Sequence, residues 1–522
     1  MAEQRATVAN REANSRGLAP AFHDSRNTVL VPLLIMAGAL ARILSYVYSD
    51  NSGGDAWTHL LLAAEWLRNP RFRVVFDAYP PGHFWLIGLT SLVVPDVVVA
   101  GRILSLVLGI ASLWVVWKLA RILYGESAAL FSLAAFCFYS LHIGYSTTSS
   151  AEVSYLFFLL AGLLLFFVYT ASPSPHRLWY VAASGVLFSI SESIRFEAWI
   201  VFGGAFILLP YLEGFRRSAS WYKSLRGPVI FGAAGGAWPA FMMAYCWRVF
   251  HDPMFLVHWN KLRVVEKLHN VPFSHQLTVM PLALLISASP FAVAAGIYGL
   301  ARSLSRSAKG GFTLLTLFFA AIETYELLTG GLLATPRYSI TLGSMLIIVA
   351  GYGFDVFCHK IAPERMRLAR AIVIALLVLN SAAVLLGSEL PNRYANQLAA
   401  VSPRLRYHPR IAAVAGYLRR HMGPNDSVVI DDYNVESDII AAASGLPIPL
   451  EKRAYLAGRK NNITVHAYIA AEHPRFLVYS DEGTLRDSLT LTPGNGSQIV
   501  DGVGFRCVFA NEVYRVYELS YP

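Results

Sequence analysis

The chain has 522 residues and a formal net charge of +10, and 55% of its residues are hydrophobic while only 15% are charged. A soluble domain carries about 25% charged residues, so this composition excludes an ordinary soluble protein and also a nucleic-acid binder, despite the positive charge. The four cysteines form no CxxC pair, so neither a zinc site nor a disulfide framework is indicated.

Apolar runs long enough to cross a bilayer dominate the first three quarters of the chain. Residues 1–27 are polar and lack a cleavable signal pattern, which predicts a short N-terminal tail. Residues 28–398 follow as a membrane domain of mainly α structure with about 11 spans. If residues 83–117 crossed twice, the next apolar run would end on the wrong side of the membrane. We therefore expect residues 83–117 to cross once, with residues 80–95 lying along the interface or re-entering.

Basic residues predict which ends of the spans face the cytosol. Segments 213–227, 301–310 and 358–370 each carry three more bases than acids, and short basic loops stay cytosolic. This places the N-terminal tail in the cytosol and the first loop, residues 49–82, on the outside. The alternative is an outside N-terminus.

Residues 399–522 have a different pattern and predict a small extracytosolic α/β domain. An amphipathic helix is expected at 411–422, and strands at 427–432 and 476–480. An acidic cluster after the first strand is interpreted as a solvated loop: Asp431, Asp432, Glu436 and Asp438.

Asp55 is the first acidic residue that we single out. It follows Gly53-Gly54 and begins a helical pattern, with His59 one turn further on the same face. Asp55 is either an ordinary helix N-cap or a carboxylate that accepts a proton from a hydroxyl or holds a divalent cation.

A second group of charges lies between residues 152 and 197. Glu152 begins an apolar run, where it either complements the helix dipole or serves the reaction. Glu192 and Arg195 are three residues apart and form an ion pair in one interpretation. In the other, Arg195 contacts an anionic phosphate while an acid orients the substrate.

Two later places offer further cations. Arg337 stands alone at the outer mouth of a span, as a snorkelling side chain or a phosphate clamp. Segment 251–276, which includes His258 and Lys261, is an interfacial helix or a surface helix that helps to bind phosphate or metal.

Three short motifs in order resemble the GT-C superfamily of membrane glycosyltransferases. The motifs are the Asp55 loop with Tyr79-Pro80-Pro81-Gly82-His83-Phe84-Trp85, then Ser149-Ser150-Ala151-Glu152, and finally Thr335-Pro336-Arg337-Tyr338. The branch that the chain resembles, over about residues 30–350, is that of the protein O-mannosyltransferases and aminoarabinose transferases. The chain departs from it at Tyr79, where the aminoarabinose group has a charged pair, and at Glu152, where an Asp is usual.

The resemblance implies transfer of a sugar from a polyprenyl-phosphate donor to an extracytosolic hydroxyl on a glycan, lipid or protein, at the inner (plasma) membrane of a bacterium. Asp55 would be the general base, and Glu152 would orient the acceptor or share Mg²⁺ or Mn²⁺ with Asp55. Arg337, with Arg195 or Lys261, would bind the phosphate. The remaining substrate-binding candidates are His59, Tyr79, His83, Glu197 and His258. Single displacement needs no nucleophile, so inversion at the anomeric carbon is expected.

The sequence contains no nucleotide-binding fingerprint, which agrees with a lipid-linked donor. The domain at 399–522 is expected to recognise the acceptor or to close over the active site. Two alternatives stay open: a transporter or flippase of lipid-linked sugars, and a non-catalytic membrane assembly protein.

Overall fold

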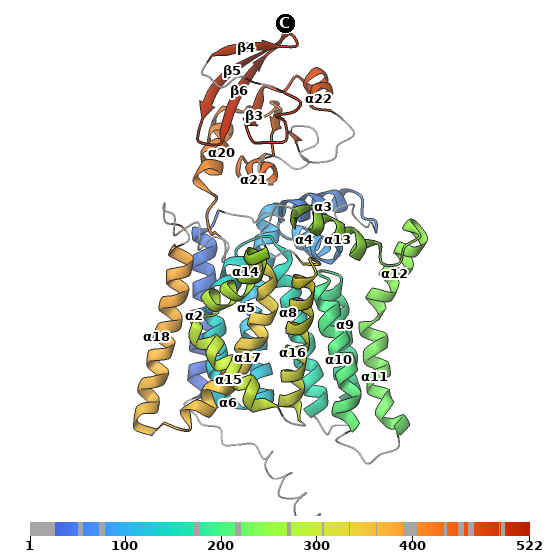
Figure 1. Ribbon diagram of the computed structural model, residues 1–522, viewed down its shortest axis with the longest axis vertical. Helices are drawn as coiled ribbons and strands as arrows, with labels where there is room; N and C mark the ends of the chain where they lie inside the picture. The colour runs from blue at the N-terminus through green and yellow to red at the C-terminus, as the bar shows by residue number, and fades with distance from the viewer. Residues whose placement is uncertain are drawn as a thin grey trace, which may run out of the picture.

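The computed structural model describes most of the chain. The described residues are 27–50, 56–72, 79–171, 177–214, 221–268, 273–304, 307–332, 335–361, 363–387, 389, 404–432, 436–446, 454–457, 464–489, 491 and 496–522. Within them, a bundle of roughly aligned helices lies below a smaller region that contains a β-sheet (Figure 1). We call the end of the bundle that faces the sheet the sheet-side end.

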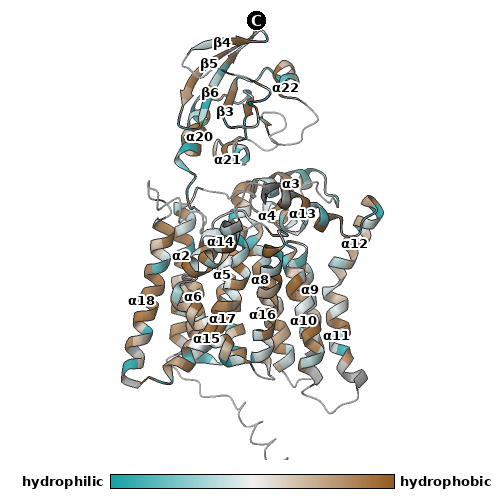
Figure 2. Cartoon of the chain, viewed as in Figure 1, coloured by the Kyte–Doolittle hydropathy of each residue, from teal (hydrophilic) through white to brown (hydrophobic). Residues whose placement is uncertain are grey.

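Six helices of the described chain are long and apolar enough to cross a membrane. They are α2 (Asn27–Tyr48), α5 (Val97–Tyr124), α8 (Ala151–Ala171), α16 (Ala308–Leu328), α17 (Ser339–Cys358, preceded by the 3₁₀ turn η1, Pro336–Tyr338) and α18 (Pro363–Gly387). Hydrophobic residues run along the helices of the bundle (Figure 2). The chain is therefore an integral membrane protein.

Two bent helix pairs raise the number of candidate spans to eight. The pair α11 (Trp221–Gly235) and α12 (Ala237–Phe250) bends by 46°, whereas α14 (Phe273–Ser287) and α15 (Pro290–Ser303) bend by 103°. Pro290 at the start of α15 favours the sharper break because its ring removes a backbone donor.

Three shorter apolar helices lie alongside these spans (Figure 1): α6 (Glu126–Cys137), α9 (Arg177–Glu192) and α10 (Glu197–Gly214). The expected total of about 11 spans is reached only when they are included. The predicted fold class, a helical membrane domain with a small C-terminal α/β region, is confirmed.

Four other helices do not qualify as spans. At the sheet-side end of the bundle lie α3 (Ala56–Arg68), α4 (Gly82–Ser91) and α13 (Phe255–Leu268), and α7 (Ser140–Tyr145) follows α6 (Figure 1). Since α4 lies beside α3 at the sheet-side end and α5 is one long candidate span, this arrangement agrees with the expectation that residues 83–117 cross once.

Close packing of the spans depends on small residues at one central contact. A Cβ atom on Gly353 of α17 would overlap the carbonyl oxygen of Ala295 on α15. Small residues let helix backbones approach in a membrane protein, where apolar burial alone does not drive association. The α15–α17 pair thereby forms one wall of the bundle core.

The C-terminal region is a six-stranded sheet in the order β2-β1-β3-β6-β5-β4. β1 pairs in parallel with β2 and β3, and the remaining pairs are antiparallel. The strands are β1 (Val428–Ile430), β2 (Ala454–Leu456), β3 (Phe476–Ser480), β4 (Ser497–Val500), β5 (Val503–Ala510) and β6 (Tyr514–Ser520), with helices α20 (Pro409–His421), α21 (Ser437–Ala443) and α22 (Val465–Glu472).

The acidic cluster after β1 is not a solvated loop, and that interpretation was wrong for two of its members. The Asp431 side chain is fully buried and accepts hydrogen bonds from the backbone N–H groups of Ser480 and Leu485, at 3.0 and 2.9 Å. Glu436 is buried as well and pairs with Arg410. These acids hold loops of the sheet region together.

Two contacts fix the sheet region over the bundle. The chain after α2 bonds to the start of this region, since Ser49 Oγ donates to the Leu405 carbonyl at 2.6 Å. Helix α21 contacts α3, and Leu60 and Ile440 belong to one buried apolar cluster. The sheet region therefore packs on helix α3 at the sheet-side end of the bundle.

Candidate active site

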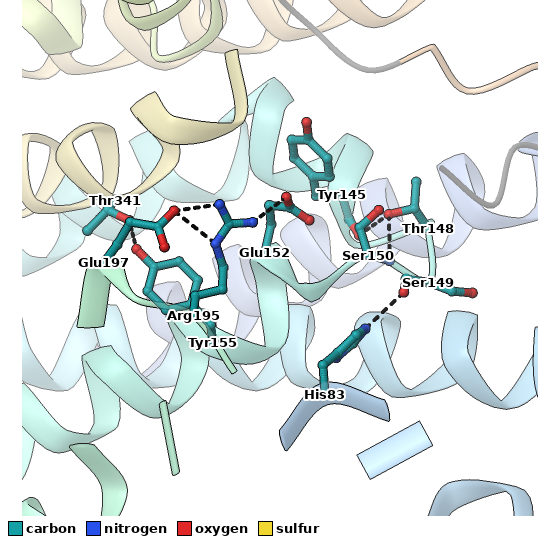
Figure 3. Close-up of polar contacts among 10 residues, drawn as sticks. All are labelled: His83, Tyr145, Thr148, Ser149, Ser150, Glu152, Tyr155, Arg195, Glu197 and Thr341. Carbon is teal, nitrogen blue, oxygen red and sulfur yellow. Dashed lines mark hydrogen bonds and ion pairs between the residues drawn. The ribbon is translucent and has the colours of Figure 1, made fainter. Parts of the chain in front are cut away.

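Arg195 is the centre of a buried charge cluster at the sheet-side end of the bundle (Figure 3). Its Nη1 donates to Glu152 Oε1 at 2.7 Å, while its Nε and Nη2 donate to Glu197 Oε1 at 2.9 and 2.5 Å. The three side chains are only 13%, 4% and 15% exposed. One arginine thus holds two carboxylates in a nearly dry setting, where electrostatic interactions are strong.

Local chain geometry explains how these residues meet. Helix α9 ends at Glu192 and α10 begins at Glu197, so Arg195 occupies the short turn between two helices. The Arg195 N–H donates to the Ser191 carbonyl, which continues the helical pattern by one turn. Glu152 lies in the first turn of α8, where the helix dipole favours an acid.

Two tyrosine rings flank the Arg195 guanidinium. Its Cζ lies 5.7 Å from the Tyr155 ring centroid and 5.3 Å from the Tyr338 ring centroid. Tyr155 hydrogen-bonds to Thr341, and the Arg337 Cζ lies 5.2 Å from the Tyr338 ring centroid. The Arg337-Tyr338 motif therefore lies beside the Arg195 cluster, although the two are far apart in the sequence.

Two buried histidines, His59 of α3 and His83 of α4, lie next to each other at the sheet-side end. The rings of His59 and His83 lie 4.9 Å apart, and Tyr79 lies 4.8 Å from His59. His83 Nε2 is 2.9 Å from the Ser149 carbonyl oxygen, so Nε2 carries the proton and Nδ1 is an acceptor. That Nδ1 is buried with no partner among the described residues.

Burial also decides the charge state of both histidines. It lowers the pKa of His83 to about 4, and lowers the pKa of His59 well below its usual value. The nearby Arg195 acts in the same direction on each. Both rings are therefore neutral near pH 7 and offer hydrogen bonds rather than charge.

A close backbone contact joins the histidine segment to the arginine turn. The Gly82 N–H donates to the Ser193 carbonyl at 2.7 Å. A Cβ atom at Gly82 would overlap the Ser193 backbone and hydroxyl, so only glycine permits this approach. The Pro-Pro-Gly-His segment thus packs directly on the turn that carries Arg195.

The structure brings together most of the predicted site. Gathered at the sheet-side end are His59, Tyr79, His83, Glu152, Arg195, Glu197 and Arg337. Asp55 lies outside the described residues, although Ala56 begins α3 directly after it. Lys261 and His258 are on α13 with exposed side chains, and His258 pairs with Asp252 at 2.8 Å instead.

One expected contact is absent. Glu192 does not pair with Arg195, because Arg195 binds Glu152 and Glu197. Both oxygens of Glu192 are buried without a partner among the described residues, and its backbone carbonyl accepts from Trp199 Nε1 at 3.2 Å. The interpretation as a local i,i+3 pair was wrong because the helix breaks directly after Glu192.

The sequence reasoning missed Tyr155 and Glu323, and it quoted Tyr338 in a motif without assigning it a role. Glu323 is an acid within the apolar helix α16 and is only 5% exposed. An ionisable group inside a span is a functional candidate by default, so that signal was available.

The divalent cation expected at Asp55 and Glu152 is not tested by the described residues, because Asp55 lies outside them. They contain no group of three or more His, Cys, Asp or Glu side chains arranged to hold a metal ion. Glu152 already has the Arg195 guanidinium at 2.7 Å, where a cation would otherwise neutralise it.

Solved structures of known proteins share this fold. ArnT from Cupriavidus metallidurans bound to undecaprenyl phosphate aligns with a TM-score of 0.61 at 14% identity, over 94% of this chain and 98% of that one. The Archaeoglobus fulgidus oligosaccharyltransferase AglB with an inhibitory peptide and a dolichol-phosphate gives 0.53 at 13% identity, over 88% and 70%. The same archaeal enzyme in complex with Zn and sulfate aligns with a TM-score of 0.54 at 14% identity, over 87% of this chain and 68% of that one. The fold is that of the GT-C membrane glycosyltransferases.

A family comparison narrows this class. Residues 78–247 match the model of the dolichyl-phosphate-mannose-protein mannosyltransferase family. This stretch contains His83, Glu152, Arg195 and Glu197. No curated protein matched the sequence. The resemblance to the GT-C superfamily is confirmed by the family match and the fold together.

Proposed function

We propose that this chain is a membrane glycosyltransferase that transfers a sugar from a polyprenyl-phosphate donor to an extracytosolic hydroxyl. The observation that carries the proposal is the buried Glu152–Arg195–Glu197 cluster, which lies beneath the surface helices of a GT-C fold. Fold alone does not define function, so the proposal depends on this site.

Arg195 and Arg337 supply positive charge for the departing lipid phosphate. The hydrogen bonds of Arg195 to the two glutamates use three of its five N–H donors, and the remaining two are available to a phosphate oxygen. A guanidinium held in place before the reaction stabilises developing charge without reorganisation. Lys261 lies on the exposed side of α13, so its place in this role requires α13 to contact the lipid headgroup.

Glu152 and Asp55 are the acids of the mechanism. Glu152 Oε2 is buried and has no partner among the described residues, so it is an acceptor for a substrate hydroxyl. Asp55 directly precedes α3, which places His59 in the site one turn later, and we assign Asp55 as the base that takes the acceptor proton. A phosphate leaving group needs no protonation. We therefore propose a single displacement with inversion at the anomeric carbon, in which Asp55 takes the acceptor proton and the lipid phosphate leaves.

The neutral rings of His59 and His83, with Tyr79 and Glu197, form the proposed substrate-binding wall. His83 Nδ1 accepts a hydroxyl hydrogen bond, since its other nitrogen already donates to Ser149. We also propose that residues 399–522 form an extracytosolic domain that covers the acceptor side, because α21 packs on α3. The basic loops support a cytosolic N-terminus, and we propose the inner membrane of a bacterium as the location.

The transporter alternative predicts charged groups deep in the spans. Arg42 of α2 is such a group, because it is fully buried. Its guanidinium donates to the carbonyls of Gly38, Phe136 and Cys137 at 2.9, 3.2 and 3.2 Å. These bonds tie α2 to α6, so Arg42 serves the packing of the bundle.

The test is transfer of radiolabelled sugar from polyprenyl-phosphate monosaccharides by the purified protein, with analysis of the anomeric configuration. Wild type should transfer with inversion, and Asp55→Asn should lose at least ~10²-fold, which is the lower range for general-base catalysis. Asp96→Asn, at the exposed N-cap of α5, is the control and should retain activity.

Each outcome separates the hypotheses. Retained configuration in the product would contradict single displacement. Undiminished transfer by Asp55→Asn would remove Asp55 from the mechanism, and sugar-lipid movement between leaflets without transfer would favour the flippase. A wild-type protein inactive with every donor, whose Asp55 variant still supports cell-envelope assembly, would favour the non-catalytic alternative.

A further inference from the structure

Glu323 is a buried carboxylate that the proposed mechanism does not use. It lies on α16, is 5% exposed, and neither of its side-chain oxygens has a hydrogen-bond partner among the described residues. A buried carboxyl without partners costs stability, so its presence calls for a ligand or another role.

The helix register brings Glu323 toward the active site. Leu327, one turn later on the same face of α16, belongs with Val279 and Met280 to a buried cluster against which Tyr338 packs. The Tyr338 ring in turn lies 5.3 Å from Arg195. Glu323 therefore lies one turn deeper in the bundle than the contact between α16 and the arginine site. It also interacts electrostatically with Glu197.

The nearby hydroxyl groups bond elsewhere. Tyr139 and Tyr155 both interact electrostatically with Glu323. However, the Tyr139 hydroxyl donates to the Ser339 carbonyl at 3.4 Å, and Tyr155 bonds to Thr341. Among the described residues, no group bonds to the acceptor atoms of Glu323, which are thus available to a ligand.

Glu192 is equally buried but makes a weaker candidate. It is the last residue of α9, and its carboxyl group has no hydrogen bond among the described residues that leads to the site tyrosines. Glu323 lies one turn from Leu327, which shares a buried cluster with Tyr338 of the site.

We propose that Glu323 binds hydroxyl groups of the donor sugar and so determines which sugar is accepted, an inference that depends on the proposed function. A carboxylate accepts several hydrogen bonds, and sugar hydroxyls are donors. In this arrangement Arg195 binds the lipid phosphate, and Glu323, one turn deeper in the bundle, binds the sugar. The substrate class is a polyprenyl-phosphate monosaccharide with free hydroxyls.

The experiment compares binding of two probes to the purified full chain: undecaprenyl phosphate alone, and the same lipid phosphate carrying mannose, glucose, galactose or arabinose. The measured quantity is the ratio of the two Kd values for the preferred sugar. In Glu323→Leu this ratio should fall about 10- to 100-fold toward one, the effect of losing about two hydrogen bonds to the sugar. Affinity for undecaprenyl phosphate alone should stay within about twofold.

Thermal unfolding distinguishes a ligand-binding role from a structural one. Leucine fills a similar volume without burying polar atoms, so the Tm of Glu323→Leu should be unchanged or higher. Glu326→Leu, three residues later on the same helix and only half-buried, is the matched control and should keep the wild-type Kd ratio.

The following results would overturn the inference. An unchanged ratio in Glu323→Leu, or an equal loss of affinity for both probes, would show that Glu323 does not bind the sugar, and a lower Tm with an unchanged ratio would make it structural. Wild-type binding of the lipid phosphate with no preference for any sugar would reject the inference while the phosphate site stands. Failure of the wild type to bind either probe would reject the proposed function itself.

Discussion

The Arg195 guanidinium donates to the Glu152 carboxylate at 2.7 Å, although 43 residues separate the two in the chain. The pair joins the start of α8 to the turn between α9 and α10. Removing one member of a buried pair leaves an uncompensated charge, which costs about 3–5 kcal/mol. This contact therefore supports both the chemistry and the local fold.

We expect Arg195→Gln to lower sugar transfer by about 10²- to 10³-fold, as does loss of one preorganised electrostatic donor in other enzymes. Glu152→Gln should also be impaired. The double variant should lose less than the two single variants added together, because the residues share one interaction. Rates measured with a saturating donor, and Tm values for each variant, give the double-mutant cycle.

The Arg121–Glu126 pair is the control for this cycle. It has a similar 2.7 Å contact but its side chains are 44% and 31% exposed, and exposed pairs contribute little. Its cycle should show no coupling in activity. Strictly additive losses for Arg195 and Glu152 would instead mean that the two act independently.

The stability of the protein should depend on pH through His83. Burial holds its pKa at about 4 in the folded state, against about 6.5 when unfolded. Between these pH values the unfolded state binds the proton and the folded state does not, so stability falls as pH falls. The loss reaches ~3 kcal/mol by pH 4.

Thermal unfolding in detergent at pH 7 and pH 5 measures this effect. His83→Gln keeps a donor for the Ser149 carbonyl but does not titrate, so its Tm should drop less on acidification. His359, at the exposed end of α17, serves as the control site, and His359→Gln should behave like wild type. Identical pH profiles for wild type and His83→Gln would contradict a neutral buried His83.

Chelation tests the divalent cation that the sequence suggested for Asp55 and Glu152. Since Arg195 already neutralises Glu152, we expect transfer activity to survive dialysis against EDTA with less than a twofold change. Activity is measured before and after dialysis, and again after Mg²⁺ or Mn²⁺ is added. A large loss that either metal restores would show that Glu152 exchanges Arg195 for a cation.

Asp431 should hold the sheet region together. Its carboxylate accepts from the N–H groups of Ser480 and Leu485 and from the Thr484 hydroxyl, so Asp431→Asn places an amide N–H₂ against a donor. A loss of about 1–3 kcal/mol is expected. Limited proteolysis of the full chain should cut residues 399–522 faster, whereas the exposed Asp487→Asn should be cut at the wild-type rate.

Much of the fold could be predicted because its signals are local. Hydropathy located the spans, and strand patterns located β1 and β3 within one or two residues of their bounds. The site was predicted in part, since acids and arginines at span ends stand out against apolar neighbours. Their partners could not be predicted. Glu192 is closer to Arg195 in sequence than Glu152 is, yet Glu152 makes the contact.

The sequence by itself determined the membrane class, the mainly helical fold and the residue types available for phosphate and acid–base chemistry, because composition and periodicity report on solvent and secondary structure. Only the tertiary structure decided which charges meet. The break between α9 and α10 places Arg195 between Glu152 and Glu197, and the packing of α16 puts Leu327 in the buried cluster that Tyr338 joins. Such pairings depend on helix ends that are distant in the chain, and no local pattern encodes that geometry.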